Sequence, residues 1–490
     1  MVDINKLIQE KESIHLEAKS AESKLPKSFW ESYSAFANTD GGIILLGVKE
    51  DNNSKKLIVN GVLKPEAIIS DIWNTLNNRQ KVSSNILINE QIYSIEFQNK
   101  TVVVVEVPRA ERYDRPVYVG QNINRGTYRR NNDGDYKCSN SEIKSMLRDQ
   151  SDKSSDNTVL ENLELNSFCN DSIKKYRMMF NNLKPNHIWS SLTNQEFLLK
   201  IGAARISQKD GIIHPTLAGL IFFGYYNEII NELPFYFLDY REHLSQDIRW
   251  TDRVCSSDSD WSGNIFDFYF RIINKLTTEV KKPFKLNKKL QRIDDTLIHS
   301  SIREVLANAL IHADYYGTRG IVIEKTCDSI QVSNPGNFRI PINEAIAGGI
   351  SDARNSRIFN MFSLIDVGER SGMGLCNLFN VWEQNNLVKP VVTETITPVE
   401  RVTIELKFVQ SKEIKKTART AQTAQNSLNS IEIEILKAVS KTPNITQKAL
   451  SSKLNIKQTT IRFYIDKLQS KYLLIRVGSN RSGYWKTNNQ

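Results

Sequence analysis

The stretch that decides the fold of this 490-residue chain is SIREVLANALIHADYY, residues 301–316. It predicts a helix that carries Glu304 and Asn308 one turn apart, so both project from the same face, with His312 a further turn along. A carboxylate in this place can orient an attacking water, and an amide oxygen can ligate a Mg²⁺ ion that bridges phosphates. The pair is compatible with a phosphate site, although such pairs are also common on solvated helix faces.

Glycine-containing turns follow this helix. VSNPG ends a predicted strand and supplies Asn334 and Gly336, and after GGISDARNSRI comes GERSGMGL, which supplies Gly368, Gly372 and Gly374 before an apolar helical run. Glycines ahead of a helix let backbone N–H groups approach phosphate oxygens at the positive helix end. Each piece alone is common, so the argument depends on their order and spacing.

In that order and spacing, residues 296–390 resemble the ATP-binding domain of GHKL ATPases, the fold of gyrase B and histidine kinases. REVLANALIHADY, SNPG and GERSGMGL are still more similar to the divergent version that accompanies AlbA-like domains. The resemblance implies ATP as cofactor, Glu304 as general base and Asn308 as Mg²⁺ ligand, with Gly336, Gly368, Gly372 and Gly374 around the nucleotide. Asn334 stands where the family has the aspartate that binds the adenine amine, so the acceptor oxygen is kept and the charge is lost.

A second set of motifs lies near the N-terminus. Glu12, Glu17 and Lys19 are followed by SAFANTDGGIILLGVKED, then by RPVYV and NRGTYRR. This series, covering about residues 8–147, resembles the AlbA-like (AlbA_2) domain shared with the schlafen family. The resemblance implies three carboxylates, Glu12, Glu17 and Glu50, that hold Mg²⁺ or Mn²⁺ beside Lys19 for phosphodiester cleavage.

Nucleic-acid contacts are expected in the same domain. Arg125, Arg129 and Arg130 are candidates for seating backbone phosphates, with Tyr118 and Tyr128 available for stacking. Many AlbA-like domains are thought only to bind nucleic acid, and a first helix rich in Glu and Lys is usually a solvated face. Binding without cleavage is therefore the alternative interpretation.

The C-terminal 60 residues predict three helices and a hairpin. Thr446 is a candidate N-cap of the second helix, while Ile461, Ile465 and Leu468 in the third follow core spacing. This pattern resembles winged helix-turn-helix domains, whose third helix meets DNA. The residues expected to contact nucleic acid are Lys457, Gln458, Thr460 and Arg462 on that helix and Arg476 and Arg481 on the wing.

Charge and composition divide the chain further. The net charge is +10, of which residues 431–490 carry +8 and residues 409–430 carry +3, so the basic excess belongs to the tail. We expect five segments: a schlafen-like domain 1–147, a connecting α/β region 158–295, a GHKL-like domain 296–408, a basic tether 409–430 and a winged helix 431–490. The polar stretch LRDQSDKSSDN (147–157) is expected to be a linker.

The remaining features of the sequence concern disulfides, metal clusters, membrane contact and location in the cell. Five scattered cysteines without a CxxC pair argue against disulfides and zinc clusters. No apolar run is long enough for a membrane span, and the charged N-terminus lacks the apolar core of a secretory signal, so we expect a cytoplasmic location without membrane contact. No GxxxxGK[ST] loop is present, which argues against a helicase.

The sequence therefore predicts an α+β multidomain protein: an α/β AlbA_2 domain, a GHKL-type (Bergerat) α/β sandwich and a winged helix. Two functions stay open. One is a nucleotide-regulated, schlafen-like endoribonuclease acting on tRNA-type substrates, with antiviral defence as its setting. The other is an ATP-responsive DNA-binding transcriptional regulator without nuclease activity. RNA, DNA and nucleotide are the expected partners, and two-fold assembly into a homo-oligomer is compatible with these modules.

Overall fold

The computed structural model describes residues 2–51, 55–244, 250–278, 297–368, 372–396, 399–410, 430–443, 445–454, 456, 458–470, 474–477 and 484–487. These residues form two compact units, Met1–Phe408 and Val409–Gln490. Residues 411–429 of the predicted tether, and the predicted DNA contacts Lys457 and Arg481, lie outside the described residues.

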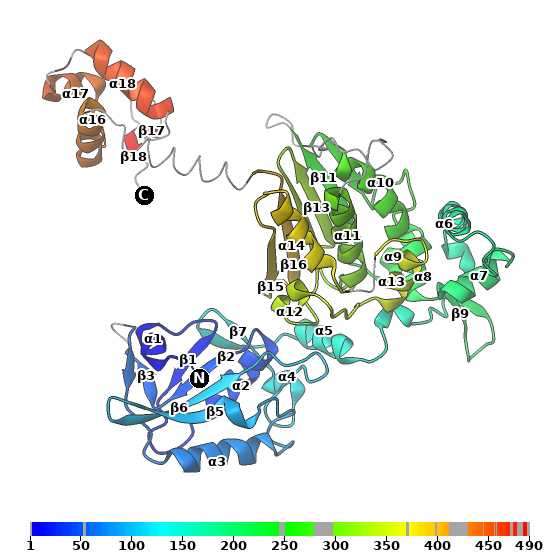
Figure 1. Ribbon diagram of the computed structural model, residues 1–490, viewed down its shortest axis with the longest axis horizontal. Coiled ribbons are helices and arrows are strands. Elements are labelled where there is room, and N and C mark those ends of the chain that lie inside the picture. The colour runs from blue at the N-terminus through cyan, green and yellow to red at the C-terminus, as the bar shows by residue number, and fades with distance from the viewer. Residues whose placement is uncertain are drawn as a thin grey trace. The chain divides into compact units, whose positions relative to one another are not determined.

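A four-stranded sheet in the order β1-β2-β6-β5 organises the N-terminal domain (Figure 1). The β-branched run in TVVVVEVP favours an extended chain and forms β6. Successive strand residues point to opposite faces, so Val103 and Val105 enter one core while Val102 and Val104 enter another. The strands are β1 (Leu16–Lys19), β2 (Gly42–Leu46), β3 (Val48–Glu50), β4 (Leu57–Val59), β5 (Ile92–Phe97), β6 (Lys100–Val107), β7 (Tyr128–Asn131) and β8 (Gly134–Lys137). The helices are α1 (Ile4–Gln9), α2 (Phe29–Asn38), α3 (Pro65–Leu76), α4 (Ile123–Gly126) and α5 (Asn140–Gln150).

The AFAN motif is explained by Asn38 at the end of α2. Its Nδ2 donates to the carbonyls of Val117 and Tyr128, and its Oδ1 accepts from the N–H of Val117. Asn38 is 7% exposed, so these bonds satisfy a buried amide. This one side chain therefore fastens RPVYV and NRGTYRR to α2.

The stretch predicted as a linker, residues 147–157, is packed against the rest of the unit. Both oxygens of Asp149 accept from Nη1 of Arg354, at 2.7 and 2.9 Å. Asp156 is fully buried and accepts from the N–H groups of Arg357 and Ile358 at a helix start. The segment has the composition of a linker, but its carboxylates accept hydrogen bonds from buried donors.

A six-stranded sheet in the order β12-β11-β13-β14-β16-β15 forms the next domain, with α10, α11 and α14 along one face (Figure 1). β11 pairs parallel to β13, so the sheet extends upstream across the boundary predicted at 296. Its strands are β11 (Leu238–His243), β12 (Asp252–Cys255), β13 (Ile321–Thr326), β14 (Ser329–Pro335), β15 (Val391–Thr395) and β16 (Arg401–Lys407). Its helices are α10 (Ile265–Thr277), α11 (Leu297–His312), α12 (Ile342–Ala347), α13 (Ser356–Ser363) and α14 (Gly374–Gln384).

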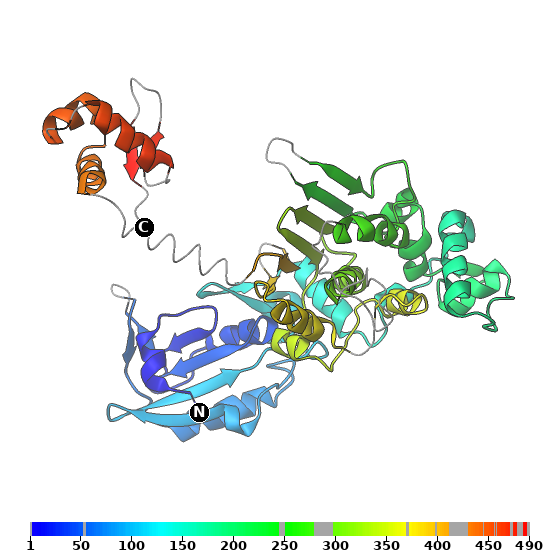
Figure 2. The ribbon, with the colours of Figure 1, turned by 45° about the horizontal axis from the view of Figure 1, so that its top comes forward.

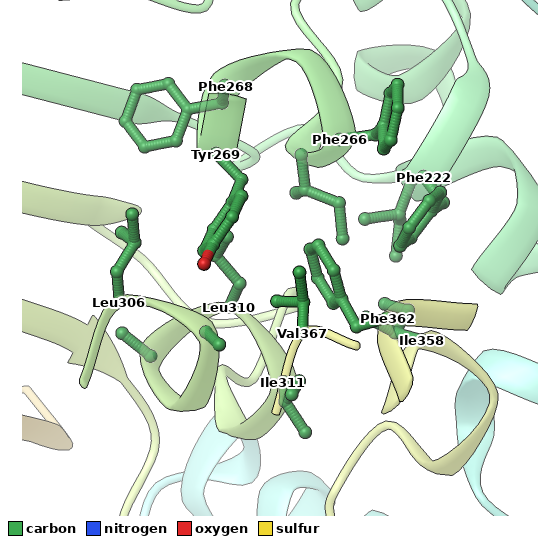
Figure 3. Packing of buried hydrophobic residues seen from close by; sticks show 14 of the residues in the cluster. Phe222, Phe266, Phe268, Tyr269, Leu306, Leu310, Ile311, Ile358, Phe362 and Val367 are labelled. Atoms are coloured by element: carbon green, nitrogen blue, oxygen red, sulfur yellow. The ribbon is translucent and has the colours of Figure 1, made fainter. Parts of the chain in front are cut away.

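The connecting region shares a single hydrophobic core with this sheet. Its elements are α6 (Asn170–Leu183), α7 (Asn194–Ile201), β9 (Ala204–Ile206), β10 (Ile213–Pro215), α8 (Leu217–Phe223) and α9 (Tyr226–Glu232). The Phe222 ring of α8 lies 4.8 Å from that of Phe362 and 5.6 Å from that of Phe266 (Figure 3). The continuous cluster runs on to Leu406, so the region is part of the same folded body.

The second unit has a small core of its own. It consists of α16 (Ser430–Lys441), α17 (Gln447–Leu454), α18 (Gln458–Ser470) and the hairpin β17 (Leu474–Val477) and β18 (Tyr484–Thr487). Ile461, Ile465 and Leu468 are fully buried in that core, as their spacing predicts. Thr446 accepts from the N–H of Ala449, which confirms it as the N-cap of α17.

The predicted fold class, an α+β multidomain protein, is confirmed, and the structure distributes its strands over several sheets. In the portion of the chain that is described, none of the helices combines the length and apolarity that crossing a membrane requires.

Candidate nucleotide site and nucleic-acid interface

Helix α11 positions the first group of predicted site residues. Val305, Leu306 and Leu310 on this helix are buried in the core, while Glu304 and Asn308 are only half-buried. The apolar positions fix the helix against its neighbours, and the polar ones are therefore held on the face that core packing does not use. α11 and α14 lie side by side in both views (Figures 1 and 2).

A pocket opens at this polar face. Glu304, Asn308 and His312 line it from α11, Asn334 from β14 and Gly374 from α14. Its other lining residues are Ala309, Asn337, Phe338, Arg339, Ile340, Ala345, Ile350, Ser351, Asp352, Gly372, Leu375, Val402 and Ile404. An apolar wall with a few converging polar groups is typical of a small-molecule site.

Gly374 is required where α14 meets α11. A Cβ on this residue would lie 2.4 Å from Oε1 of Glu304 and 3.0 Å from Nδ2 of Asn308. Any larger side chain would therefore displace the predicted catalytic pair. α14 therefore begins beside Glu304 and Asn308, and its first N–H groups have no partner within the helix.

Asn334 ends β14 at the pocket wall and is 7% exposed. Its Nδ2 donates to the carbonyl of Pro335 at 3.3 Å, a long bond to a neighbouring residue. Its side-chain oxygen can accept a hydrogen bond from a nucleobase amine. Its Nδ2 can donate to a base carbonyl once the bond to Pro335 breaks. An ionised aspartate in its place could only accept.

Gly336 and Gly368 lie outside the pocket lining. Gly336 has a φ of +95° and packs against Asp314 and Arg354, and Gly368 has a φ of +79° beside Ile311 and Phe359. Both adopt backbone conformations that favour glycine, in turns next to the site. We therefore assign them to the scaffold of the pocket.

Burial lowers the pKa of His312 to about 4, and the nearby guanidinium groups of Arg354 and Arg339 act in the same direction. The ordinary value is about 6.5, so the folded protein holds this imidazole neutral while the unfolded chain takes up the proton. His312 thus contributes stability that is complete above about pH 6.5 and is lost as the pH falls toward 4.

We expect this loss to disappear in His312→Asn. Between pH 7 and 4.5, the free energy of unfolding of the wild type should fall by an amount of order 2 kcal/mol relative to the variant. Denaturant unfolding over this pH range measures the difference, with the exposed His15→Asn as the matched control. A wild-type-to-variant difference that does not change with pH would contradict the assignment.

Phe338, Arg339 and Asp352 are among the lining residues that the sequence motifs do not predict. All three contact groups upstream of residue 152, in the N-terminal domain or α5. Asp352 belongs to GGISDARNSRI, a stretch whose sequence gives no sign of that partner. Contacts between residues so distant in sequence leave no local pattern.

The N-terminal acids converge, but in a charge-compensated cluster. Glu17 is 7% exposed, with Oε1 2.6 Å from Nζ of Lys19 and Oε2 2.7 Å from Nη1 of Arg130. The pKa of Glu12 is raised by burial and by the neighbouring carboxylates of Glu17 and Glu50. Across the described parts of the chain, no three acidic, histidine or cysteine side chains are close enough to hold a metal ion.

The three arginines predicted to seat phosphates have different environments. Arg130 is 1% exposed and bonds Glu17, Asp135 and the carbonyls of Ser13 and Leu16, so its burial does not agree with phosphate binding. Arg129 is half-buried and pairs with Glu142 at 2.9 Å. Arg125 lies in α4 and is exposed, so its burial does not conflict with the prediction of a phosphate contact.

Four of the six predicted DNA contacts of the winged helix belong to the described residues. Gln458 and Arg462 on α18 are exposed and Thr460 is half-buried, opposite the core positions. Arg476 belongs to β17. Nε1 of Trp485 in β18 donates to the carbonyl of Ile445, which attaches the hairpin to the helices.

Comparisons with known proteins agree with this architecture. A family model described as "Schlafen, AlbA_2" matches residues 12–139, and one described as "Putative ATP-dependent DNA helicase recG C-terminal" matches 318–404. A "Winged helix-turn-helix DNA-binding" model matches 428–471, and a domain of unknown function, DUF8451, matches 144–239. The predicted combination of a schlafen-type AlbA_2 domain, an ATPase-like domain and a winged helix is confirmed.

No curated protein matches the chain. Among solved structures, the DIP2311 protein from Corynebacterium diphtheriae is 14% identical, with coverage of 98% of this chain and 92% of that one and a TM-score of 0.40. The N-terminal domain of a RecG-related protein from Nitrosomonas europaea is 26% identical, with coverage of 28% and 95% and a TM-score of 0.23.

Proposed function

We propose that this protein is a nucleotide-responsive regulator that binds DNA and does not cut it. An ATP-type nucleotide binds in the pocket between α11, β14 and α14, and its presence changes how the chain holds nucleic acid. Asn308 would ligate the Mg²⁺ ion that accompanies the phosphates, and this ion would neutralise their charge. Glu304 would orient a water beside them.

One contact carries this proposal. Arg109, which follows β6 in the N-terminal domain, places Nη1 2.7 Å from Oε2 of Glu394 and Nη2 3.0 Å from the carbonyl of Phe338. Oε1 of Glu394 accepts from the N–H of Phe338 at 2.7 Å. Phe338 also lines the pocket, so a ligand that shifts this wall changes the bonds that hold the N-terminal domain.

Charge gives the second support. Glu394 is 3% exposed in its side chain and Arg109 is 11% exposed, so the ion pair is largely removed from water. Breaking a buried pair leaves uncompensated charge, so opening this contact carries a substantial free-energy cost. A protein that needed no communication between its pocket and its N-terminal domain would gain little from such a pair.

A gel-shift titration of the full chain with duplex DNA, with and without saturating ATP, tests the proposal. We expect ATP to change the apparent DNA affinity by about fivefold or more, the usual range of allosteric coupling. Asn308→Ala should abolish the response and keep the basal affinity, and the exposed Asn377→Ala on α14 serves as control. DNA binding that is indifferent to ATP, in protein that binds ATP, would refute the regulator.

A metal-dependent nuclease is the second candidate, and the convergence of Glu12, Glu17 and Glu50 favours it. In the present arrangement these residues do not fit a metal ion, because Lys19 and Arg130 already bind the oxygens of Glu17. We therefore derive no cleavage step and favour binding without cleavage.

We expect labelled tRNA and DNA to remain intact when incubated with the full chain in Mg²⁺ or Mn²⁺, with or without ATP. Electrophoresis of the products measures this. Cleavage that Glu17→Gln and Glu12→Gln both abolish, and that the exposed Glu66→Gln on α3 preserves, would replace the regulator with the nuclease.

A further inference from the structure

The nucleotide pocket borders a second hollow that the N-terminal domain helps to form. The two share Arg339, Ser351 and Asp352. The second hollow is otherwise lined by Arg112, Ser151, Asp152, Ser154, Ala353, Ser356 and Phe359. A ligand that fills the first pocket can therefore extend toward Arg112 of the N-terminal domain.

Where the two cavities adjoin, two arginines from different domains form ion pairs with the same carboxylate. Nε of Arg112 lies 2.5 Å from Oδ2 of Asp352, and Nη1 of Arg339 lies 3.3 Å from Oδ1 of the same residue. The side chains of Arg112 and Arg339 are 9% and 8% exposed, whereas that of Asp352 is 26% exposed. The most accessible member of the trio is thus the anion between the two cations.

Arg339 has an unsatisfied donor. Its Nη1 and Nη2 donate to the carbonyls of Ala353 and Asp149, but among the described residues no acceptor reaches its Nε. The carboxylate of Asp149 is 3.8 Å away and is bound on both oxygens by Arg354. Burial lowers the pKa of Arg339, with neighbouring Arg112 and Arg354 acting in the same direction. A buried guanidinium with an unused donor is short of anionic partners.

We propose that Arg339 and Arg112 form a subsite for the phosphate chain of the bound nucleotide, and that Asp352 occupies it when no nucleotide is present. This subsite rests on the proposed nucleotide function, and it makes the two arginines the groups that sense the ligand. The Nε groups of the two arginines, one bonded to Asp352 and the other without an acceptor, can donate to phosphate oxygens. A polyphosphate also carries more charge than one carboxylate. Binding releases Asp352, so that the N-terminal domain holds the ligand through Arg112.

Calorimetric titration of the full chain with adenosine, ADP, ATP and inorganic tripolyphosphate tests the subsite. We expect Arg339→Gln and Arg112→Gln to weaken ATP binding about tenfold while adenosine binding is unchanged. Arg205→Gln, at an exposed arginine of β9, is the matched control. Asp352→Asn should bind ATP a few-fold more tightly than the wild type, because the competing charge is gone, and misfolding cannot produce this gain.

The two proposals fail differently. Wild-type affinity for ATP in Arg339→Gln, or no gain in Asp352→Asn, overturns the subsite and leaves nucleotide binding intact. A wild type that binds tripolyphosphate through Arg339 but no nucleotide supports the subsite and overturns the proposed function. A wild type that binds neither overturns both.

Discussion

Alanine at position 374 is expected to weaken ATP binding by about 100-fold or more, equivalent to about 2.7 kcal/mol. The added Cβ would lie 2.4 Å from Oε1 of Glu304, whereas Cβ atoms in proteins essentially never approach another heavy atom closer than 3.0 Å. Glu304 can swing away because the clash involves the end of its side chain. The fold then survives, but the carboxylate and the Asn308 amide leave the place where the phosphates and their Mg²⁺ would bind.

Titration calorimetry with ATP measures this loss, and scanning calorimetry checks that the unfolding temperature changes little. Asn377→Ala, one turn along α14 and exposed, is the control for altering the helix without touching α11. An unchanged ATP affinity in Gly374→Ala would mean that the phosphates do not lie at the start of α14.

The nucleotide pocket could be predicted because its signals are local. Helical spacing brings Glu304 and Asn308 to one face, and glycines mark the start of α14. The partners of the pocket could not be predicted, since Arg109 and Phe338 or Arg112 and Asp352 are far apart in sequence. Such pairs form only when the N-terminal domain docks, and docking is set by surface shape that no short motif encodes.

Arg130 shows a signal that the sequence did offer. It follows Arg129 in β7, and neighbouring residues in a strand point to opposite faces. Both could not face a nucleic acid from the same surface, so one had to turn inward, where it meets the carboxylates of Glu17 and Asp135. Alternation predicts that one of the pair is buried, and the acidic residues inside decide which.

The upstream extent of the ATPase-like sheet had no such signal. β11 and β13 pair in parallel, and parallel strands need a long crossover, here the segment containing α10 and α11. The sequence shows LPFYFLDYRE only as a short strand of unknown partner. Its place beside β13 follows from the packing of α8, α10 and α11 in one core, which is a property of the whole chain from Leu160 to Leu406.

Removing the Phe222 ring should test this single core, at an expected cost of about 3–5 kcal/mol in the free energy of unfolding. Phe222 is fully buried, and its ring centroid lies 4.8–5.7 Å from those of Tyr176, Phe223, Phe266 and Phe362. Figure 3 shows it beside Phe266 and Phe362. Truncation to alanine leaves a cavity among rings that hold each other in place, so the surroundings cannot close over it.

Because that cavity lies between α8, α10 and α13, we expect Phe222→Ala to lower the unfolding temperature of the connecting region and the ATPase-like sheet together. Scanning calorimetry measures this, with Phe235→Ala, at a side chain that is 57% exposed, as the control. The winged helix has a separate core and should keep its own transition. If the connecting region melted alone, ahead of an unchanged ATPase-like domain, the two would be separate folding units. The stability of the pocket would then not depend on the connecting region.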